Sequence, residues 1–364
     1  MRTTAIAVLC LALAAGVLSA QDSEDPVARL EAVFADPPAT GVVITMVAPK
    51  SQAAEQGVKV GDIFVSYNGV ATTDVPALNA AKGTVGEKLE IEIVVVGSAG
   101  RRTITLAPGQ IGVNGAPVEK GVPGGMLPKA TGVTFDFSRF AGEGLDQWFA
   151  FSLDGRTKVG FEHAKLRFTG GRLFLRREVA FDGGEAWGVN HFDVTVVVTV
   201  APAVDTVMTR FTNPLTGWIM TGRLTRNESG ARIWAQKWPE LGDVRAEIPG
   251  PVVPTYLIET LAGMMPLEKG ACYRFSPLNE GMGTVGLPSA LVVRGREEIE
   301  HGLGQVKVWR VEQVVLGGTV AGVYWISEQG RTLKVSYGGA FGIRTTKEAA
   351  LKDLHPEIKP RTAK

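Results

Sequence analysis

The chain has 364 residues, 45% of them hydrophobic, and a formal net charge of +1. This length and hydrophobic content allow two domains with buried cores, and the near-zero charge, without a long run of one sign, excludes the electrostatic pattern of a nucleic-acid-binding protein. The 45 glycines and 20 prolines favour many turns and a β-rich architecture over long helices.

Residues 1–20 are typical of a cleaved export signal. Arg2 is positively charged, residues 5–17 are apolar, and Ala20 ends a group of small residues before Gln21. An uncleaved N-terminal anchor is the alternative. We therefore expect an exported protein, periplasmic or extracellular, that is cleaved near Ala20 and has no transmembrane segment in its mature form. Cleavage would leave Cys272 as the only cysteine, which excludes an internal disulfide.

Residues 41–69 read GVVITMVAPKSQAAEQGVKVGDIFVSYNG. The β-branched run at 42–44 indicates a buried strand, and Ser51 is placed to cap a short helix over 52–56. Gly57 is expected to end that helix in a left-handed conformation. A second strand follows at 63–67, and Asn68-Gly69 predicts a tight turn.

This order, with the run P-x-S-x-A-A-x-x-G-V-K-x-G-D-x-x-x-x-x-N-G, resembles a bacterial PDZ domain of the Deg/HtrA type, which we place at residues 26–108. The resemblance implies that a peptide of a protein partner adds a strand to the sheet edge. An apolar–Gly–apolar loop then holds its C-terminal carboxylate through backbone N–H groups. Docking of this domain against its neighbour, or dimerisation, is the alternative.

The resemblance also implies positions for the peptide groove. Residues 27–34 are expected to form the accepting edge strand, with Leu30, Glu31 and Ala32 at the carboxylate loop. Glu31 departs from the family's glycine there, and its charge would repel a carboxylate. A helix over 74–82, with Thr73 as its N-cap, is expected to form the other wall and to present Leu78 and Asn79 to the groove.

Residues 109–144 are rich in Gly, Pro and Ala and show little periodicity, which is typical of a linker. We expect relative motion of the two domains that it joins.

A β-rich domain is predicted at 145–351, followed by a charged tail at 352–364. Strands are expected at 148–153, 158–168, 172–181, 187–200, 206–212, 218–226, 232–238, 243–248, 289–299, 305–316, 320–328 and 332–337, with Cys272 on a further strand. One internal helix begins at Pro254, and Thr346 is expected to cap a helical turn at 347–351. The predicted fold class is α+β and mostly β, with a PDZ domain followed by a larger, curved antiparallel sheet wrapped around one helix.

The segments WFAFSLDGRTKVGFEH and VYWISEQGRTLKV are similar to a family of exported bacterial proteins of uncharacterised function. The resemblance covers about residues 145–350 and implies the half-barrel of periplasmic lipoprotein carriers, with at most a concave apolar surface. All seven tryptophans lie in this region, where core packing and the lining of a ligand cavity are both open. Tyr256, Leu257 and Leu261 are the candidates for contacts with an apolar ligand or lipid held between sheet and helix.

No catalytic motif was found in the sequence. Ser-protease, aspartic-protease, zincin, hydrolase-elbow and phosphate-loop motifs are absent. The four histidines (His163, His191, His301 and His355) are isolated in sequence, so we predict no metal and no cofactor. Cys272 is interpreted as a buried apolar residue. Three functions remain: a non-enzymatic binding or scaffold protein, a periplasmic carrier of an apolar ligand, and an enzyme with an unrecognised site.

Overall fold

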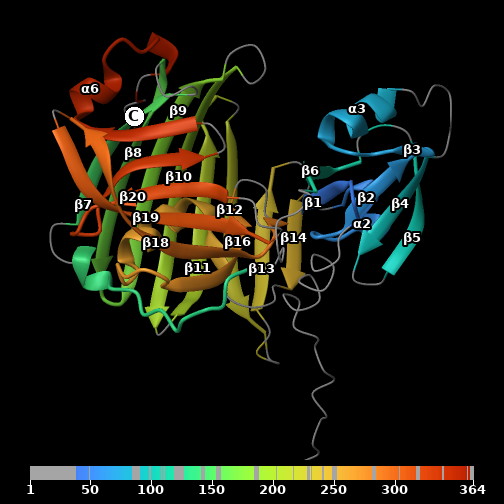
Figure 1. Ribbon diagram of the computed structural model, residues 1–364, viewed down its shortest axis with the longest axis horizontal. Helices are drawn as coiled ribbons and strands as arrows, with labels where there is room; N and C mark the ends of the chain where they lie inside the picture. Colours follow the sequence, from blue (N-terminus) through green and yellow to red (C-terminus); the bar gives the residue numbers. More distant parts are fainter. Residues whose placement is uncertain are drawn as a thin grey trace, which may run out of the picture.

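The fold was analysed in a computed structural model. It describes residues 38–360 except 49, 84–90, 98–99, 108, 110, 119–126, 141–143, 153–156, 184–187, 202, 216, 228–229, 231, 240–241, 248–251, 281–283, 303, 317–319, 338–339 and 359. Figure 1 shows an N-terminal domain, drawn in blue, beside a larger β-rich domain.

The N-terminal domain is a small sheet whose strands lie in the order β5-β4-β2-β1-β6, with β3 paired to β2. Its strands are β1 (Val42–Val47), β2 (Ile63–Tyr67), β3 (Val70–Ala71), β4 (Ile91–Gly97), β5 (Gly100–Leu106) and β6 (Val113–Pro117). Side chains alternate between the faces of a strand, so the apolar run of β1 implies that both faces of the sheet are covered. Val42 and Ile44 pack in the domain's own core, and Val43 packs in a different cluster.

Two short helices complete this domain. Ser51 accepts a hydrogen bond from the Ala54 N–H and caps α2 (Gln52–Glu55), and Gly57 has the expected positive φ of 66°. Helix α3 (Val75–Gly83) is capped by Asp74, whose carboxylate accepts from the Ala77 N–H at 2.7 Å. The prediction of Thr73 as this cap was wrong by one residue.

The β-rich domain is built on one 16-stranded sheet. Its path runs β14-β13-β12-β11-β10-β9-β8-β7-β22-β21-β20-β19-β18-β16-β15, and β17 pairs with β16. The strands are β7 (Leu145–Ser152), β8 (Lys158–Thr169), β9 (Arg172–Asp182), β10 (Val189–Ala201), β11 (Ala203–Asn213), β12 (Trp218–Arg226), β13 (Arg232–Trp238), β14 (Gly242–Glu247), β15 (Val252–Pro254), β16 (Cys272–Asn279), β17 (Thr284–Val285), β18 (Ser289–His301), β19 (Gly304–Val315), β20 (Val320–Ile326), β21 (Thr332–Tyr337) and β22 (Ala340–Thr345). Only the pairing of β15 with β16 is parallel among the described pairs.

This sheet bends into two layers around one helix, as the predicted fold class requires. In Figure 1 the green and yellow strands run upright, and the orange strands cross in front of them. Helix α5 (Ile258–Met264) follows the 3-10 turn η2 (Thr255–Leu257), and every residue of α5 is buried. Strands of both layers and α5 contribute to the main core, so the helix fills the space between them. The chain ends with α6 (Lys347–Leu351), capped by Thr346, and the turn η3 (Pro356–Ile358).

The segment predicted as a linker, 109–144, contains ordered structure. Residues 113–117 form β6 and pair with β1. Further on, Thr131 exchanges two hydrogen bonds with the backbone of Cys272, and Arg139 donates to the Gly263 carbonyl oxygen at 2.8 Å. The 3-10 turn η1 (Phe137–Phe140) brings Phe140 into the main core. Hydrogen bonds to neighbouring parts of the fold therefore order a segment whose composition predicted a linker.

The two domains share an apolar interface. Val43 and Ile63 of the N-terminal domain lie in one cluster with Leu287, Val292 and Leu316 of the β-rich domain. Leu127, from the segment between the domains, is part of the same cluster and is 3% exposed. The structure thus places these domains in direct contact, where the linker composition predicted relative motion. No helix among the described residues is long and apolar enough to span a membrane.

Candidate functional site

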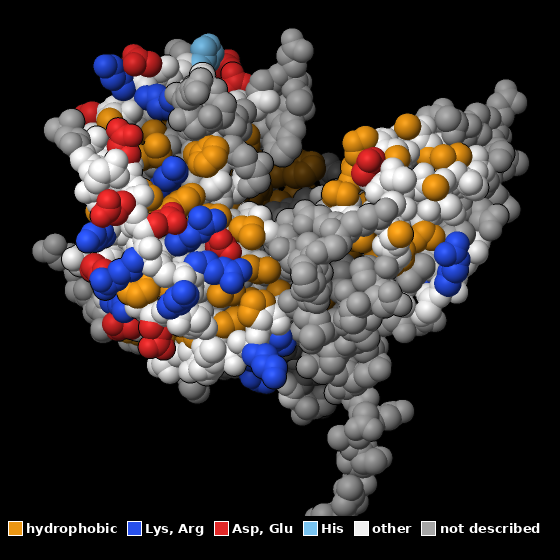
Figure 2. All heavy atoms as spheres, in the orientation of Figure 1, with side chains coloured by type: hydrophobic (Ala, Val, Ile, Leu, Met, Phe, Trp, Pro, Cys, Tyr) orange, Lys and Arg blue, Asp and Glu red, His pale blue; other side chains and the backbone are white. Residues whose placement is uncertain are grey.

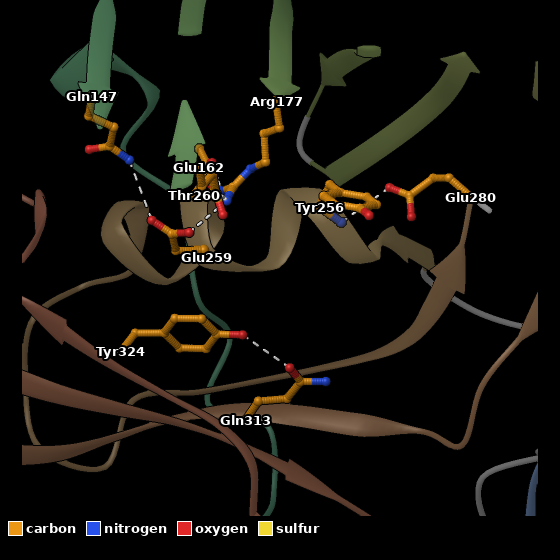
Figure 3. Close-up of polar contacts among 9 residues, drawn as sticks. All are labelled: Gln147, Glu162, Arg177, Tyr256, Glu259, Thr260, Glu280, Gln313 and Tyr324. Carbon is orange, nitrogen blue, oxygen red and sulfur yellow. Dashed lines mark hydrogen bonds and ion pairs between the residues drawn. The ribbon is translucent and has the colours of Figure 1, made fainter. Parts of the chain in front are cut away.

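A polar cluster lies in the centre of the β-rich domain (Figure 3). Arg177 of β9 is 2% exposed and donates from one guanidinium nitrogen to Glu162 of β8 and to Glu259 of α5, the latter at 2.7 Å. The same guanidinium contacts the Thr260 hydroxyl at 3.4 Å, and the Gln147 amide contacts Glu259 at 3.4 Å. These contacts fix α5 to the upright strands.

A second carboxylate lies at the start of the same helical segment. Glu280 accepts hydrogen bonds from the Thr255 N–H at 3.1 Å and from the Tyr256 N–H at 3.2 Å. It also accepts from the Thr255 hydroxyl at 2.6 Å. The carboxylate therefore satisfies two backbone donors that a helix start leaves without intrahelical partners.

Burial dominates the ionisation of these groups. Desolvation raises the pKa of Glu280 to about 7, against the lowering effect of its bonds to Thr255 and Tyr256. Desolvation also raises the pKa of Glu162, although the Arg177 guanidinium acts in the opposite sense. Burial raises the pKa of Tyr256 as well. Each of the three carboxylates (Glu162, Glu259 and Glu280) is engaged by protein atoms, so this arrangement stabilises a packed helix and leaves none of them free for a ligand.

The second candidate site is the free edge of the N-terminal sheet. β6 is the last strand of its sheet and pairs with β1 alone among the described strands. Helix α3 lies against β6 (Figure 1). Val47, Val75 and Val113, at the ends of β1, α3 and β6 that meet here, are half-buried and pack on the domain core. An open strand edge beside a helix, with apolar side chains between them, is the geometry in which an extended peptide adds to a sheet.

The loop that precedes β6 is pinned by two of its carbonyl groups. The Ile111 carbonyl oxygen accepts from the Ala53 N–H at 3.1 Å, and the Gly112 carbonyl oxygen accepts from the Ala48 N–H at 2.7 Å. In a trans peptide, the carbonyl and the N–H of the next residue point in opposite directions. The N–H groups of Gly112 and Val113 consequently point away from α2 and β1. Two adjacent amides that are directed away from these elements, at the head of an edge strand, are an arrangement that can hold a carboxylate.

Glycine is required at position 112 in this loop. Its φ is +80°, which disfavours a side chain, and an added Cβ would lie 2.2 Å from the Ser51 Cβ. Ile111, before it, is buried in the domain core. Ile111-Gly112-Val113 therefore has the apolar–Gly–apolar pattern expected of a carboxylate loop.

A comparison with family models identifies a PDZ domain in the N-terminal part of the chain. Residues 43–95 match the family model of the PDZ domain. The match concerns the PDZ domain in general and leaves the Deg/HtrA type a prediction. It ends before β5 and β6, so the strand and loop of the candidate groove follow the matched residues.

Comparison with curated proteins gave no match. The chain is similar to the crystal structure of a β-barrel-like protein of the domain of unknown function DUF1849 from Brucella abortus, at 12% identity and a TM-score of 0.38, over 55% of this chain and 94% of that one. It is also similar to a DUF1089 family protein from Pseudomonas aeruginosa, at 12% identity and a TM-score of 0.30, over 50% and 92%.

The edge strand predicted at 27–34 lies outside the described residues. Among the described strands, β6 (residues 113–117) occupies the place beside β1. Leu30, Glu31 and Ala32 lie outside the described residues. On α3, Leu78 is buried in the core, and Asn79 is exposed. Asn79 follows Val75 by four residues and shares its side of the helix, so Val75 and Asn79 are the helix positions that can reach the groove.

The apolar-ligand candidates of the β-rich domain are part of its core. Leu257 and Leu261 are fully buried, and Tyr256 is half-buried against the same cluster. Cys272 is 1% exposed at the start of β16, and burial raises the pKa of its thiol, which disfavours the nucleophilic thiolate. His163 pairs with Asp146 at 2.7 Å, and His191 with Glu178 at 3.0 Å. Within the described ranges, no three His, Cys, Asp or Glu side chains are grouped to hold a metal.

The raised pKa of Glu280 predicts a pH dependence of stability. Its pKa of about 7 in the folded chain exceeds the ordinary glutamate pKa of 4.5, so the folded chain holds the proton more tightly than the unfolded chain does. The contribution of this group to the free energy of unfolding is then full below about pH 4.5 and is lost as the pH rises to about 7, by up to about 3 kcal/mol. Glu280→Gln should match the wild type at pH 5 and exceed it at pH 8.

Urea unfolding of both proteins at pH 5, 6, 7 and 8 measures this difference. Glu357→Gln is the control, because Glu357 is exposed near the C-terminus. A difference between wild type and Glu280→Gln that stays constant over this range would contradict the assignment.

Proposed function

We propose that this protein is a non-enzymatic binding protein whose PDZ domain captures the C-terminal segment of a protein partner. The observation on which the proposal rests is the pair of outward N–H groups at Gly112 and Val113, at the head of the free strand β6. A peptide that pairs with β6 ends with its carboxylate at these two amides. The PDZ match at 43–95 supports the same class of ligand.

The edge of β6 sets the register of such a peptide. Since residues alternate along a strand, the Val113 and Gly115 backbone groups point to the free side, and those of Asn114 point to β1. A bound peptide therefore hydrogen-bonds at every second residue. Its side chains that point toward the domain meet Val113 and Val75, so apolar residues at alternate positions are favoured.

Peptide binding can be measured by fluorescence polarisation with a labelled extended peptide that carries valine at alternate positions and at its C-terminus. We expect the free-carboxylate form to bind at least tenfold more tightly than the amidated form, because hydrogen bonds to a charged group contribute about 1.5–3 kcal/mol. N-methylation should abolish binding at alternate peptide positions and have little effect between them. Val113→Ser should weaken binding.

Val70→Ser is the matched control, because Val70 is a 47% exposed valine on β3 of the same sheet. Equal binding of the free and amidated peptides, with no alternation in the N-methyl series, would refute strand addition at β6. Docking onto the β-rich domain, or dimerisation, would then be the better account of this domain.

Export is a second part of the proposal and rests on the sequence of residues 1–20. The protein would then meet its partner in the periplasm or outside the cell. N-terminal sequencing of the protein from its native source tests this, with a start near Gln21 expected and a retained Met1 as the contrary result.

A further inference from the structure

The outer face of β11 to β14 is a distinct surface of the β-rich domain. Arg210 lies beside Thr221, Arg223 beside Ala235, and Ala235 beside Arg245 on the next strand. Lys237 lies between Thr221 and Asp243. The residues of these strands that alternate with them, such as Leu224 and Trp234, are buried in the core. All these charged side chains therefore point away from the core, on one face of four adjacent strands.

The cations of this face lack the partners found elsewhere in the domain. Arg210, Arg223, Lys237 and Arg245 are exposed, and none forms an ion pair within the described part of the chain. Asp243 is the one described acidic side chain among them. A shallow hollow of about 210 Å³ lies over Ala235 and is lined by Arg223, Lys237, Asp243 and Arg245. The described side chains of this face thus carry a net positive charge, and the small side chain of Ala235 forms the floor of the hollow.

The opposite situation holds on the outer face of β18 to β20. There Arg294 pairs with Glu312, Arg296 with Glu328, and Arg310 with Glu297. Figure 2 shows blue and red side chains intermingled on the larger domain, on the side where Figure 1 places these strands. The four cations of the β11 to β14 face, in contrast, form no such ion pairs within the described part of the chain.

Exposed apolar side chains lie on the same strands, and three of them are at one end. The described residues include seven large hydrophobic side chains that are exposed, and four of them belong to β11, β12 and the turn between them. These four are Met208, Leu215, Trp218 and Ile219, with exposed fractions of 38–47%. Leu215 and Trp218 lie at the tip of the hairpin, where no neighbouring strand covers them. Ile219 pairs with Thr212 just inside it.

We infer that this hairpin tip and the adjoining basic face form a docking surface for an anionic lipid bilayer. A bilayer accepts apolar and aromatic side chains that project from a tip, and its anionic headgroups attract Lys and Arg. Tryptophan is favoured where one end of the side chain is apolar and the other is wet. A protein partner would instead need a hollow on its surface that is complementary to the projecting tip.

The spacing along the strands fits this assignment. Residues of one face repeat about every 7 Å along a strand. With the tip at the hydrocarbon boundary, Arg210 and Lys237 lie one repeat above Ile219, at the level of the headgroups. Arg223 and Arg245 lie one repeat higher, still within about 10 Å of the lipid charge, which is the screening length at 0.1 M salt.

Cosedimentation with vesicles tests the proposal, with full-length chain, vesicles of phosphatidylcholine alone and vesicles with one third phosphatidylglycerol. We expect at least tenfold more binding to the anionic vesicles at low salt, and a decline as salt rises. Neutralising the four cations with glutamine (R210Q, R223Q, K237Q, R245Q) should remove this preference. Serine at the three tip positions (L215S, W218S, I219S) should lower binding to anionic vesicles at least tenfold.

Matched controls carry equal numbers of substitutions elsewhere: K59Q, R101Q, K129Q and R172Q for charge, and V70S, V320S and I343S for exposed apolar residues. Residues 1–20, with their apolar run, are present in all variants, so any contribution of this segment to vesicle binding is the same in each. The conclusion therefore rests on the differences between variants. Circular dichroism confirms that each variant is folded. Binding that is equal in test and control variants overturns the proposal, and so does the absence of binding to anionic vesicles, which would favour a protein partner for this face.

Discussion

Arg177→Met is expected to lower the free energy of unfolding by about 3–5 kcal/mol. The substitution leaves Glu162 and Glu259, which both contact Arg177, buried without their cation. An uncompensated buried charge is among the largest single-residue penalties on stability. Urea unfolding followed by tryptophan fluorescence measures the loss, because all seven tryptophans lie in the β-rich domain. Adding Glu162→Gln and Glu259→Gln to Arg177→Met should restore part of it.

The neighbouring residue provides the control. Arg176 also pairs with a carboxylate, that of Asp193 at 2.5 Å, but its side chain is 53% exposed on the outer face. Exposed ion pairs contribute at most about 1 kcal/mol. If Arg176→Met destabilises the protein as much as Arg177→Met does, the buried cluster is not what holds α5.

Ile63→Ser is expected to destabilise the PDZ domain by about 2–5 kcal/mol and to uncouple it from the β-rich domain. Ile63 is fully buried, and its cluster includes Leu287 and Leu316 from across the interface, so the substitution removes core volume and buries a hydroxyl. In the wild type we expect the two domains to lose hydrogen-exchange protection together. In the variant, β1 and β2 should open before the β-rich domain does.

Val70→Ser again serves as the control, because Val70 is exposed on the same sheet. Were the two domains merely tethered, Ile63→Ser would cost no more than this control, and protection of β1 and β2 would already be separate in the wild type.

The strands of the β-rich domain could be predicted because their signals are local. Each of the long strands β8 to β13 alternates apolar and polar residues between glycine-rich turns, and its observed bounds lie within three residues of those expected. Strand β22 was not predicted. In residues 340–345, Phe341 and Ile343 lie on either side of Gly342, and apolar and polar residues do not alternate clearly along the segment.

The groove strand was missed because its signal competed with composition. Residues 109–117 contain three glycines and Pro117, which favour a linker. The apolar–Gly–apolar pattern at Ile111-Gly112-Val113 was the signal in the sequence that could have indicated a carboxylate loop. It becomes recognisable once the following strand is seen to pair with β1. Sequence position suggested an upstream edge strand at 27–34, which lies outside the described residues, whereas the pairing of β6 with β1 joins segments about 70 residues apart.

The buried cluster could not be predicted for a similar reason. Arg177 lies in the run Arg176-Arg177-Glu178, which is typical of an exposed strand. Its partner Glu259 is more than 80 residues away, on a helix whose every residue is buried. Only the wrapping of the sheet around α5 turns this arginine inward.

The pairing of β7 with β22 has a consequence for how the chain folds as it is made. Trp148 of β7 is paired with Thr345 of β22. One edge of β7, the first strand of the β-rich domain, is therefore covered only after β22, its last strand, has been synthesised. Closing so long a loop makes this seam a late and slow step, during which β7 offers unpaired backbone groups to other chains. The PDZ domain, whose β1 and β6 lie within residues 42–117, has no such delay and can be complete while the rest is still being synthesised. Aggregation of newly made protein should therefore start from the open side of β7.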